Sequence, residues 1–178
     1  MINGTVKIMR DYIIESENST DHWPFFKTSG HNVLDLGCGR WYTDKKEELS
    51  PFYFGRDANL VVGVDYNAQD IEYYTQETEG DPKYVFKAMN LINAEQFKEL
   101  INTYNITALK CDIEGDEVHM LKLTKQDLIN ISEIAIEYHS EDLRDKFIAK
   151  LEEWGFSINT FANFARTPIS LGVLFCSK

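Results

Sequence analysis

The sequence predicts an α/β fold in which a seven-stranded, mostly parallel sheet ends in an antiparallel hairpin. From residue 32 onward, short apolar runs rich in β-branched side chains alternate with longer amphipathic stretches. This alternation is typical of βαβ units, in which a helix connects two parallel strands. The last two apolar runs have no stretch of helix length between them, so a hairpin is the simplest connection.

The predicted strands are runs of five or six residues dominated by aliphatic and aromatic side chains. In chain order they cover residues 32–37, 60–65, 83–88, 108–112, 133–138, 156–161 and 171–176. A plain dinucleotide-binding domain would continue after its fifth strand with another crossover helix. The final antiparallel pair therefore favours a different member of the α/β class.

Helices are predicted to begin after Asn67, Asn93 and Ser140, because each side chain can accept a backbone N–H at a helix start. Over residues 141–154 the apolar side chains recur at helical spacing, and Gly155 follows as a natural C-cap. These helices fall between the predicted strands, as the βαβ pattern requires.

The length of 178 residues and the 43% apolar content fit one globular domain with a sizeable core. We expect a single domain over residues 1–178, with a cap segment over residues 1–31 and an α/β core over residues 32–178. The cap segment contains Trp23 and the pair Phe25-Phe26, and it is predicted to cover one sheet edge or the mouth of a ligand site.

The charge balance restricts the class of partner. With 18 basic and 29 acidic side chains the net charge is −11, which repels nucleic acid and anionic membrane surfaces. No apolar run approaches the roughly 18 residues that span a bilayer, and residues 1–11 lack the apolar core of a signal peptide. We expect a cytoplasmic protein in which Cys38, Cys111 and Cys176 are reduced, buried side chains.

The first predicted strand ends in the sequence Asp35-Leu-Gly37-Cys-Gly39, where a loop without Cβ atoms can pass close to a ligand. This sequence resembles the first motif of class I S-adenosylmethionine-dependent methyltransferases. The resemblance implies a Rossmann-like methyltransferase fold and S-adenosylmethionine as cofactor. It also implies that Asp35 organises the amino-acid end of the cofactor, while Gly37 and Gly39 let the backbone approach it. Trp41 stands where the family pattern often carries another glycine.

Asp65 ends the second predicted strand, where a carboxylate can accept hydrogen bonds from two ribose hydroxyls. Tyr66 beside it is placed to pack on an adenine. After the third strand, Asn90 is placed to contact the adenine edge and Met89 its face. Two alternatives stay open, because Asp65 can instead cap the helix that starts near Asn67 and the residues after the third strand can be plain turn residues.

Residues 109–117 run from the fourth predicted strand into a helix with Val118 and Leu121 on one face. This stretch resembles the signature of FkbM-type methyltransferases, with Lys110, Asp112, Glu114 and Gly115 at the motif positions. The resemblance implies O-methylation of a hydroxyl on a sugar or small molecule.

A carboxylate at the end of this strand can take the hydroxyl proton as a general base. Asp112 is the first candidate, and Glu114 is either the base or a ligand of the cofactor ammonium. The alternative is an acidic helix start favoured by the helix dipole.

The fifth predicted strand ends in Glu137-Tyr138-His139, next to the fourth strand in this topology. Alternation along a strand puts Glu137 and His139 on one face. Together with Asp112 they are candidate ligands of Mg²⁺ or Mn²⁺, an ion that would polarise the acceptor hydroxyl. His139 alone is a candidate general base, and a pairing with surface groups is the third interpretation.

The sequence as a whole predicts an S-adenosylmethionine-dependent O-methyltransferase of a small-molecule or carbohydrate acceptor. The candidate cofactor-binding residues are Asp35, Gly37, Gly39, Asp65, Tyr66 and Asn90, and the candidate catalytic residues are Asp112, Glu114, Glu137 and His139. Two alternatives remain, namely a non-catalytic module that binds the cofactor or its product, and an NAD-dependent oxidoreductase. The antiparallel pair and the stretch from Lys110 to Glu117 speak against the oxidoreductase.

Overall fold

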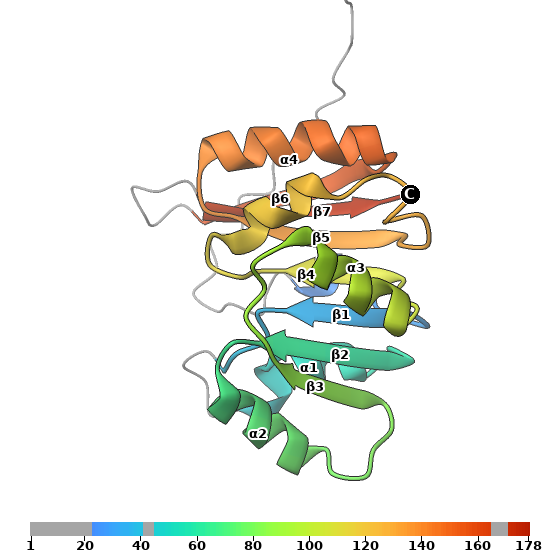
Figure 1. Ribbon diagram of the computed structural model, residues 1–178, viewed down its shortest axis with the longest axis vertical. Coiled ribbons are helices and arrows are strands. Elements are labelled where there is room, and N and C mark those ends of the chain that lie inside the picture. Colours follow the sequence, from blue (N-terminus) through green and yellow to red (C-terminus); the bar gives the residue numbers. More distant parts are fainter. Residues whose placement is uncertain (1–22, 41–44, 165–170) are drawn as a thin grey trace, which may run out of the picture.

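The computed structural model describes residues 23–40, 45–164 and 171–178, which form one mixed sheet with helices on both faces (Figure 1). The strand order is β3-β2-β1-β4-β5-β7-β6. The strands are β1 (Asn32–Leu36), β2 (Leu60–Asp65), β3 (Tyr84–Ala88), β4 (Ala108–Cys111), β5 (Glu133–Tyr138), β6 (Ser157–Phe164) and β7 (Leu171–Ser177). The α-helices are α1 (Ser50–Gly55), α2 (Ala68–Glu77), α3 (Ala94–Thr103) and α4 (Glu141–Trp154), and the 3-10 helices are η1 (Trp23–Phe25), η2 (Lys46–Glu48) and η3 (Asp116–Lys122).

The predicted sheet is confirmed, strand by strand. Strands β1 to β5 pair in parallel, and β7 pairs antiparallel with both β5 and β6. β6 extends to Phe164, beyond the predicted end at residue 161, and its register with β7 shifts between Ile158 and Thr160. Such an irregularity bends a strand locally.

The three predicted helix starts are also confirmed. The side chain of Asn67 accepts the N–H of Gln69 at 3.0 Å, Asn93 accepts that of Gln96 at 3.1 Å, and Ser140 accepts that of Leu143 at 3.1 Å. α4 ends at Gly155, whose φ of 89° is in the left-handed region that favours glycine at a helix C-cap.

The segment after β4 differs from the prediction. It forms the 3-10 helix η3, with three residues per turn, so that Glu117 and Met120 point to the same side and are buried. Val118, which was expected to share a helical face with Leu121, is 44% exposed, whereas the acidic side chain of Glu117 is in the interior.

Helices cover the sheet in two layers. α3, η3 and α4 pack on one face, where the largest apolar cluster contains Phe97, Met120 and Trp154. On the other face, α1 packs against β1 and β2, and Phe26 meets Phe54 edge-on with ring centroids 5.3 Å apart. The described part of the predicted cap segment therefore lies against a face of the sheet. Residues 1–22 and Trp41 lie outside the described residues.

All three cysteines are buried and free, as expected. Within the described ranges, none of the helices combines the length and the apolar character that crossing a bilayer requires.

One ion pair is buried at the centre of the sheet. Asp35 on β1 and Lys110 on β4 are register partners, so their side chains leave the same face, and Lys110 Nζ lies 3.1 Å from Asp35 Oδ1. Lys110 also donates to the carbonyl oxygens of Leu36 at 3.2 Å and Gly37 at 2.7 Å. Burial lowers the pKa of Lys110, but the negative charges of Asp35 and Asp112 outweigh it and the net shift is upward. The lysine is therefore a permanent cation.

Replacing Lys110 by methionine should destabilise the fold by about 3–5 kcal/mol, because it leaves the carboxylate of Asp35 buried without its cation. Urea unfolding followed by circular dichroism measures the change. The double variant Asp35→Leu/Lys110→Met removes both charges and should recover much of the loss. Equal stability of the single and double variants would contradict the role given to the pair.

Candidate functional site

A cleft of about 570 Å³ opens at the carboxyl ends of the central parallel strands. This is the edge where ligands bind in open α/β sheets, because the loops there diverge from a reversal in strand order. The cleft is lined by Gly37, Gly39, Arg40, Val64, Asp65, Tyr66, Asn67, Asp70, Met89, Asn90, Leu91, Asp112, Ile113, Glu114 and Asp116. Most of the residues predicted to bind the cofactor are in this lining.

Two glycines let the loop after β1 follow the cleft floor. Gly37 has a φ of 74°, and a Cβ there would lie 1.5 Å from the carbonyl oxygen of Asp112. A Cβ at Gly39 would lie 2.9 Å from Asp65 Oδ2. Any larger side chain at either position would force the loop away from β2 or β4.

Asp65 contacts the backbone both at the start of α2 and in the glycine loop. Its Oδ1 accepts the N–H of Asn67 at 2.8 Å, next to the start of α2, and its Oδ2 accepts the N–H of Gly39 at 2.8 Å. The residue nevertheless lines the cleft, and each carboxylate oxygen has two lone pairs. Asp65 therefore holds the glycine loop against α2 and keeps acceptor capacity for a ligand hydroxyl.

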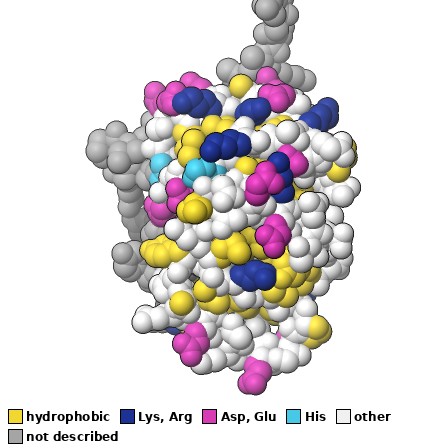
Figure 2. All heavy atoms as spheres, viewed as in Figure 1, with side chains coloured by type: hydrophobic (Ala, Val, Ile, Leu, Met, Phe, Trp, Pro, Cys, Tyr) yellow, Lys and Arg dark blue, Asp and Glu magenta, His cyan; other side chains and the backbone are white. Residues whose placement is uncertain are grey.

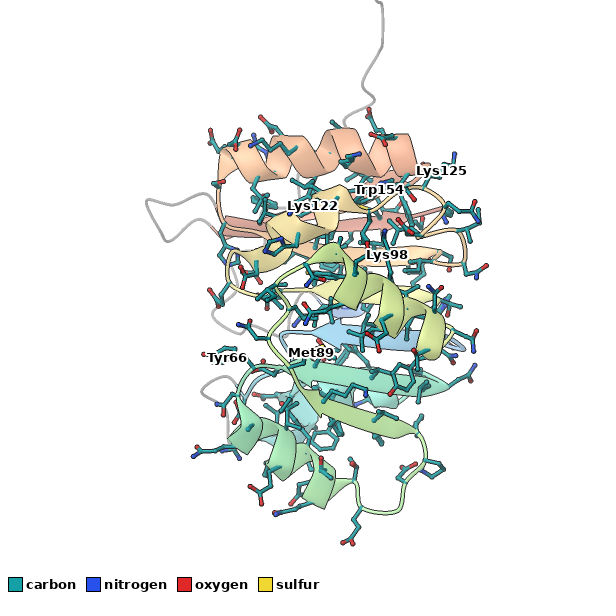
Figure 3. All side chains as sticks on the ribbon, viewed as in Figure 1. Tyr66, Met89, Lys98, Lys122, Lys125 and Trp154 are labelled. Atoms are coloured by element: carbon teal, nitrogen blue, oxygen red, sulfur yellow. The ribbon has the colours of Figure 1, made fainter. Side chains whose placement is uncertain are left out.

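Tyr66, Met89 and Asn90 lie at the β2 and β3 side of the cleft. Tyr66 is 78% exposed, and it lies close to Met89 at the carboxyl ends of the strands (Figure 3). The aromatic ring and the thioether offer a planar ligand apolar contacts, and the Asn90 amide offers it hydrogen-bonding groups.

Asp35 does not line the cleft. Its carboxylate is 0% exposed and accepts a hydrogen bond from Ser50 Oγ at 2.6 Å besides its contact with Lys110. It reaches the cleft only indirectly, because Lys110 in turn holds the carbonyl oxygen of Gly37.

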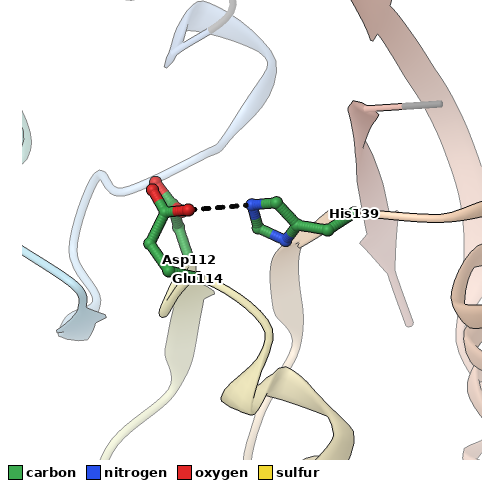
Figure 4. Close-up of side chains that lie close together, drawn as sticks. All are labelled: Asp112, Glu114 and His139. Carbon is green, nitrogen blue, oxygen red and sulfur yellow. Dashed lines mark ion pairs between the residues drawn. The ribbon is translucent and has the colours of Figure 1, made fainter. Parts of the chain in front are cut away.

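A cluster of titratable groups forms the opposite wall. The cluster contains Asp112, Glu114 and His139 (Figure 4). Each of them offers one possible ligand atom, and these three atoms lie within 4.8 Å of one another. His139 Nε2 is 3.5 Å from Glu114 Oε2 and 3.8 Å from Glu137 Oε1. Asp112 and Glu114 face the cleft, whereas Glu137 and His139 lie behind them. The grouping with metal-ligand spacing contains Glu114, where Glu137 had been expected.

The strand alternation predicted for this segment is confirmed, since Tyr138 is buried in the core on the other face of the sheet from Glu137 and His139. Burial, together with the charge of Asp112 and a hydrogen bond with it, raises the pKa of Glu137 to about 9. The adjacent Glu117 carboxylate, together with Glu137 and Glu114, raises the pKa of His139 to about 9, against an opposing effect of burial. Both shifts favour the protonated forms of Glu137 and His139.

Several residues of the site were not predicted from the sequence, among them Glu117, Arg40 and Asp70. Glu117 is fully buried beside His139, with its Oε1 3.5 Å from Nδ1 of the ring. Arg40 lines the cleft and pairs with Asp70 at 3.2 Å, across a contact that joins the glycine loop to α2. The available signal for Glu117 was its place in an acidic stretch, which by itself suggests only an exposed helix start.

The lining of the cleft is strongly acidic. It contains the single cation Arg40 and the carboxylates of Asp65, Asp70, Asp112, Glu114 and Asp116. Such a cleft attracts cationic ligands and repels anionic ones.

The sequence matches no family model and no curated protein. The structure is similar to fibrillarin from Aeropyrum pernix with natively bound S-adenosyl-L-methionine, at a TM-score of 0.55 and 8% identity over 84% of this chain and 67% of that chain. It is also similar to magnesium protoporphyrin IX methyltransferase from Synechocystis with bound S-adenosylhomocysteine. The TM-score is 0.54 and the sequence identity 12%, over 84% of this chain and 74% of that chain.

A third structural neighbour is a precorrin 8w decarboxylase from Methanobacterium thermoautotrophicum. Its TM-score is 0.56 and its sequence identity 15%, over 85% of this chain and 83% of that chain. The chain spans about two thirds of the length of several such neighbours. These similarities show that the chain has the Rossmann-like methyltransferase fold.

Thermal stability should fall as the pH rises from about 6 to 9. In this interval the folded state binds more protons than the unfolded state, because the pKa values of Glu137 and His139 are raised from 4.5 and 6.5 to about 9. Scanning calorimetry across this range should show that the melting temperature falls less steeply with pH in Glu137→Gln than in the parent protein. In the control Glu79→Gln, which changes an exposed side chain, the melting temperature should fall as steeply as in the parent protein. Equal slopes in Glu137→Gln and the parent protein would contradict the assignment.

Proposed function

We propose that this protein is an S-adenosylmethionine-dependent methyltransferase that transfers a methyl group to a hydroxyl of a small molecule or carbohydrate. The observation that carries the proposal is the cleft itself, which joins a glycine loop and Asp65 on one side to Asp112 and Glu114 on the other. The neighbours with bound S-adenosylmethionine or its product support the choice of cofactor.

In this proposal the cofactor lies along the carboxyl ends of the strands. Asp65 accepts hydrogen bonds from the ribose hydroxyls, and the adenine lies against Tyr66 and Met89 with Asn90 at its edge. The amino-acid end passes over the backbone of Gly37 and Gly39, which brings the methyl group toward Asp112.

The charge of the cleft favours S-adenosylmethionine over NAD. The methyl donor carries a sulfonium and an ammonium, whereas NAD would bring a pyrophosphate among five carboxylates and one arginine. The same charges disfavour a phosphorylated or nucleic-acid acceptor. On the face formed by α3, η3 and α4, the described Lys and Arg side chains are interspersed with Asp and Glu, without a continuous basic band (Figure 2).

Asp112 and Glu114 are the proposed proton acceptors, because they are the carboxylates at the cleft wall nearest the expected methyl group. As the acceptor oxygen bonds to the methyl carbon, the carbon–sulfur bond breaks and the hydroxyl proton becomes acidic. A carboxylate then takes that proton, and S-adenosylhomocysteine leaves with a neutral sulfur. The resemblance of residues 109–117 to FkbM-type methyltransferases supports a hydroxyl acceptor.

The proposal does not require a metal ion in the cluster. His139, whose pKa is raised, already lies beside Glu114 and Glu117, so the negative charges of these two carboxylates have a cationic partner. If Asp112, Glu114 and His139 bind Mg²⁺ or Mn²⁺, the ion would polarise the acceptor hydroxyl. Activity measured with and without a chelator distinguishes the two cases.

Isothermal titration should detect binding of S-adenosylhomocysteine and no binding of NAD. Asp65→Ala should weaken binding of S-adenosylhomocysteine roughly 10- to 100-fold, as expected for the loss of a charged hydrogen-bond acceptor. Asp57→Ala, an exposed change near the amino ends of the strands, is the matched control and should bind normally. Tight NAD binding, or no binding of either ligand, would refute the proposed cofactor.

With radiolabelled S-adenosylmethionine and a panel of hydroxylated sugars and phenols, the parent protein should label at least one acceptor. Replacing the proton acceptor should lower kcat about 10²- to 10⁴-fold while S-adenosylhomocysteine still binds. Comparing Asp112→Asn with Glu114→Gln identifies which carboxylate serves. Binding of the cofactor without labelling of any acceptor would favour the non-catalytic module.

A further inference from the structure

Glu117 is a buried carboxylate with a precise set of partners. It is 0% exposed, its Oε1 accepts the N–H of Ile113 at 2.8 Å, and its Oε2 accepts the N–H of Gly115 at 2.7 Å. Burial raises the pKa of such a group, but His139 and the two amides outweigh burial and lower it. Glu117 therefore stays ionised in the interior.

The two amides that Glu117 holds flank Glu114. This residue has a φ of 56° and Gly115 has a φ of 106°, so two successive residues are in the left-handed region. A glutamate in that region is uncommon and persists where the surroundings hold it. By bonding the backbone on both sides, Glu117 fixes the turn that presents the Glu114 side chain at the cleft wall.

The same carboxylate meets the ring of His139 from the other side. Nδ1 lies 3.5 Å from Glu117 Oε1, whereas Nε2 points toward Glu114 and Glu137. The titratable groups that face the ring are thus Glu117 on η3, Glu114 on the preceding turn and Glu137 on β5, with Asp112 beyond β4 completing the cluster. Of the three that touch the ring, only Glu117 is fully buried.

We propose that Glu117 is a positioning residue, which holds His139 with Nδ1–H toward its own carboxylate and Nε2 toward Glu114 at the cleft wall. One buried charge then fixes both the turn that carries Glu114 and the ring behind it. A carboxylate that accepts from one ring nitrogen determines which nitrogen faces the reacting groups. The importance of this arrangement for methyl transfer rests on the function proposed above.

The pairing can be tested by ¹⁵N NMR of the histidine rings, with His139→Gln used to assign the signal. In the parent protein the His139 ring should titrate well above the ordinary value, and its neutral form should keep the proton on Nδ1. Glu117→Gln should lower the pKa of His139 more than Glu114→Gln does, because the Glu114 side chain is 57% exposed. Glu95→Gln, on the surface of α3, should change nothing.

The functional part is tested by steady-state kinetics on the same variants. Glu117→Gln should lower kcat about 10- to 100-fold with little change in the KM for S-adenosylmethionine, since the glycine loop and Asp65 are untouched. Glu117→Asp keeps the negative charge and should restore the His139 titration in part. A merely structural role would instead lower the melting temperature and leave the pKa of His139 unchanged.

Two outcomes would overturn the proposal. One is a neutral His139 ring in the parent protein that carries its proton on Nε2, a result that needs no variant to fold. The other is an unchanged His139 titration in folded Glu117→Gln. The NMR measurement requires neither cofactor nor acceptor. A failure to bind S-adenosylhomocysteine would therefore refute the proposed function, while the NMR titration would still test the pairing of Glu117 with His139.

Discussion

The buried ion pair between Lys110 and Asp35 is the constraint around which the functional edge of the sheet is arranged. Placing two charges in the interior is costly, and it is tolerated only where hydrogen bonds satisfy both groups. Lys110 meets this condition by binding Asp35, approaching Asp112 at 3.5 Å and donating to the carbonyl oxygens of Leu36 and Gly37. One cation thereby joins the ends of β1 and β4 to the loop that lines the cleft.

The acidic cleft depends on the same electrostatic balance. Carboxylates gather at its walls because the ends of β2 and β4 and the turn before η3 all carry them, and they would repel one another without nearby cations. Lys110 lies beside the carboxylate of Asp112, and Arg40 pairs with Asp70. His139 lies beside the carboxylate of Glu114 in the cleft wall. Burial and the charge of Asp112 raise the pKa of Glu137, which disfavours a further buried negative charge. The acidic lining makes the cleft suited to a cationic ligand.

The site also illustrates how one element serves both fold and chemistry. η3 is a short 3-10 helix whose three-residue turn directs Met120 into the core and Glu117 toward His139 on one side. Its Glu117 carboxylate reaches both the turn before η3 and the ring that follows β5. The local tightening of the backbone is therefore part of the arrangement of the cleft wall.

The sequence by itself determined the strands, the helix starts at Asn67, Asn93 and Ser140, and the gathering of Gly37, Asp65 and Asp112 at one edge. These follow from local hydrophobic patterns, from hydrogen bonds between near neighbours, and from the rule that parallel strands bring their carboxyl ends together. Only the tertiary structure decided that Asp35 turns inward to Lys110, that Glu137 and His139 lie behind the cleft wall, and that Glu117 is buried. Those placements depend on strand register and on which elements pack together, and a shift of one residue would send each side chain to the opposite face.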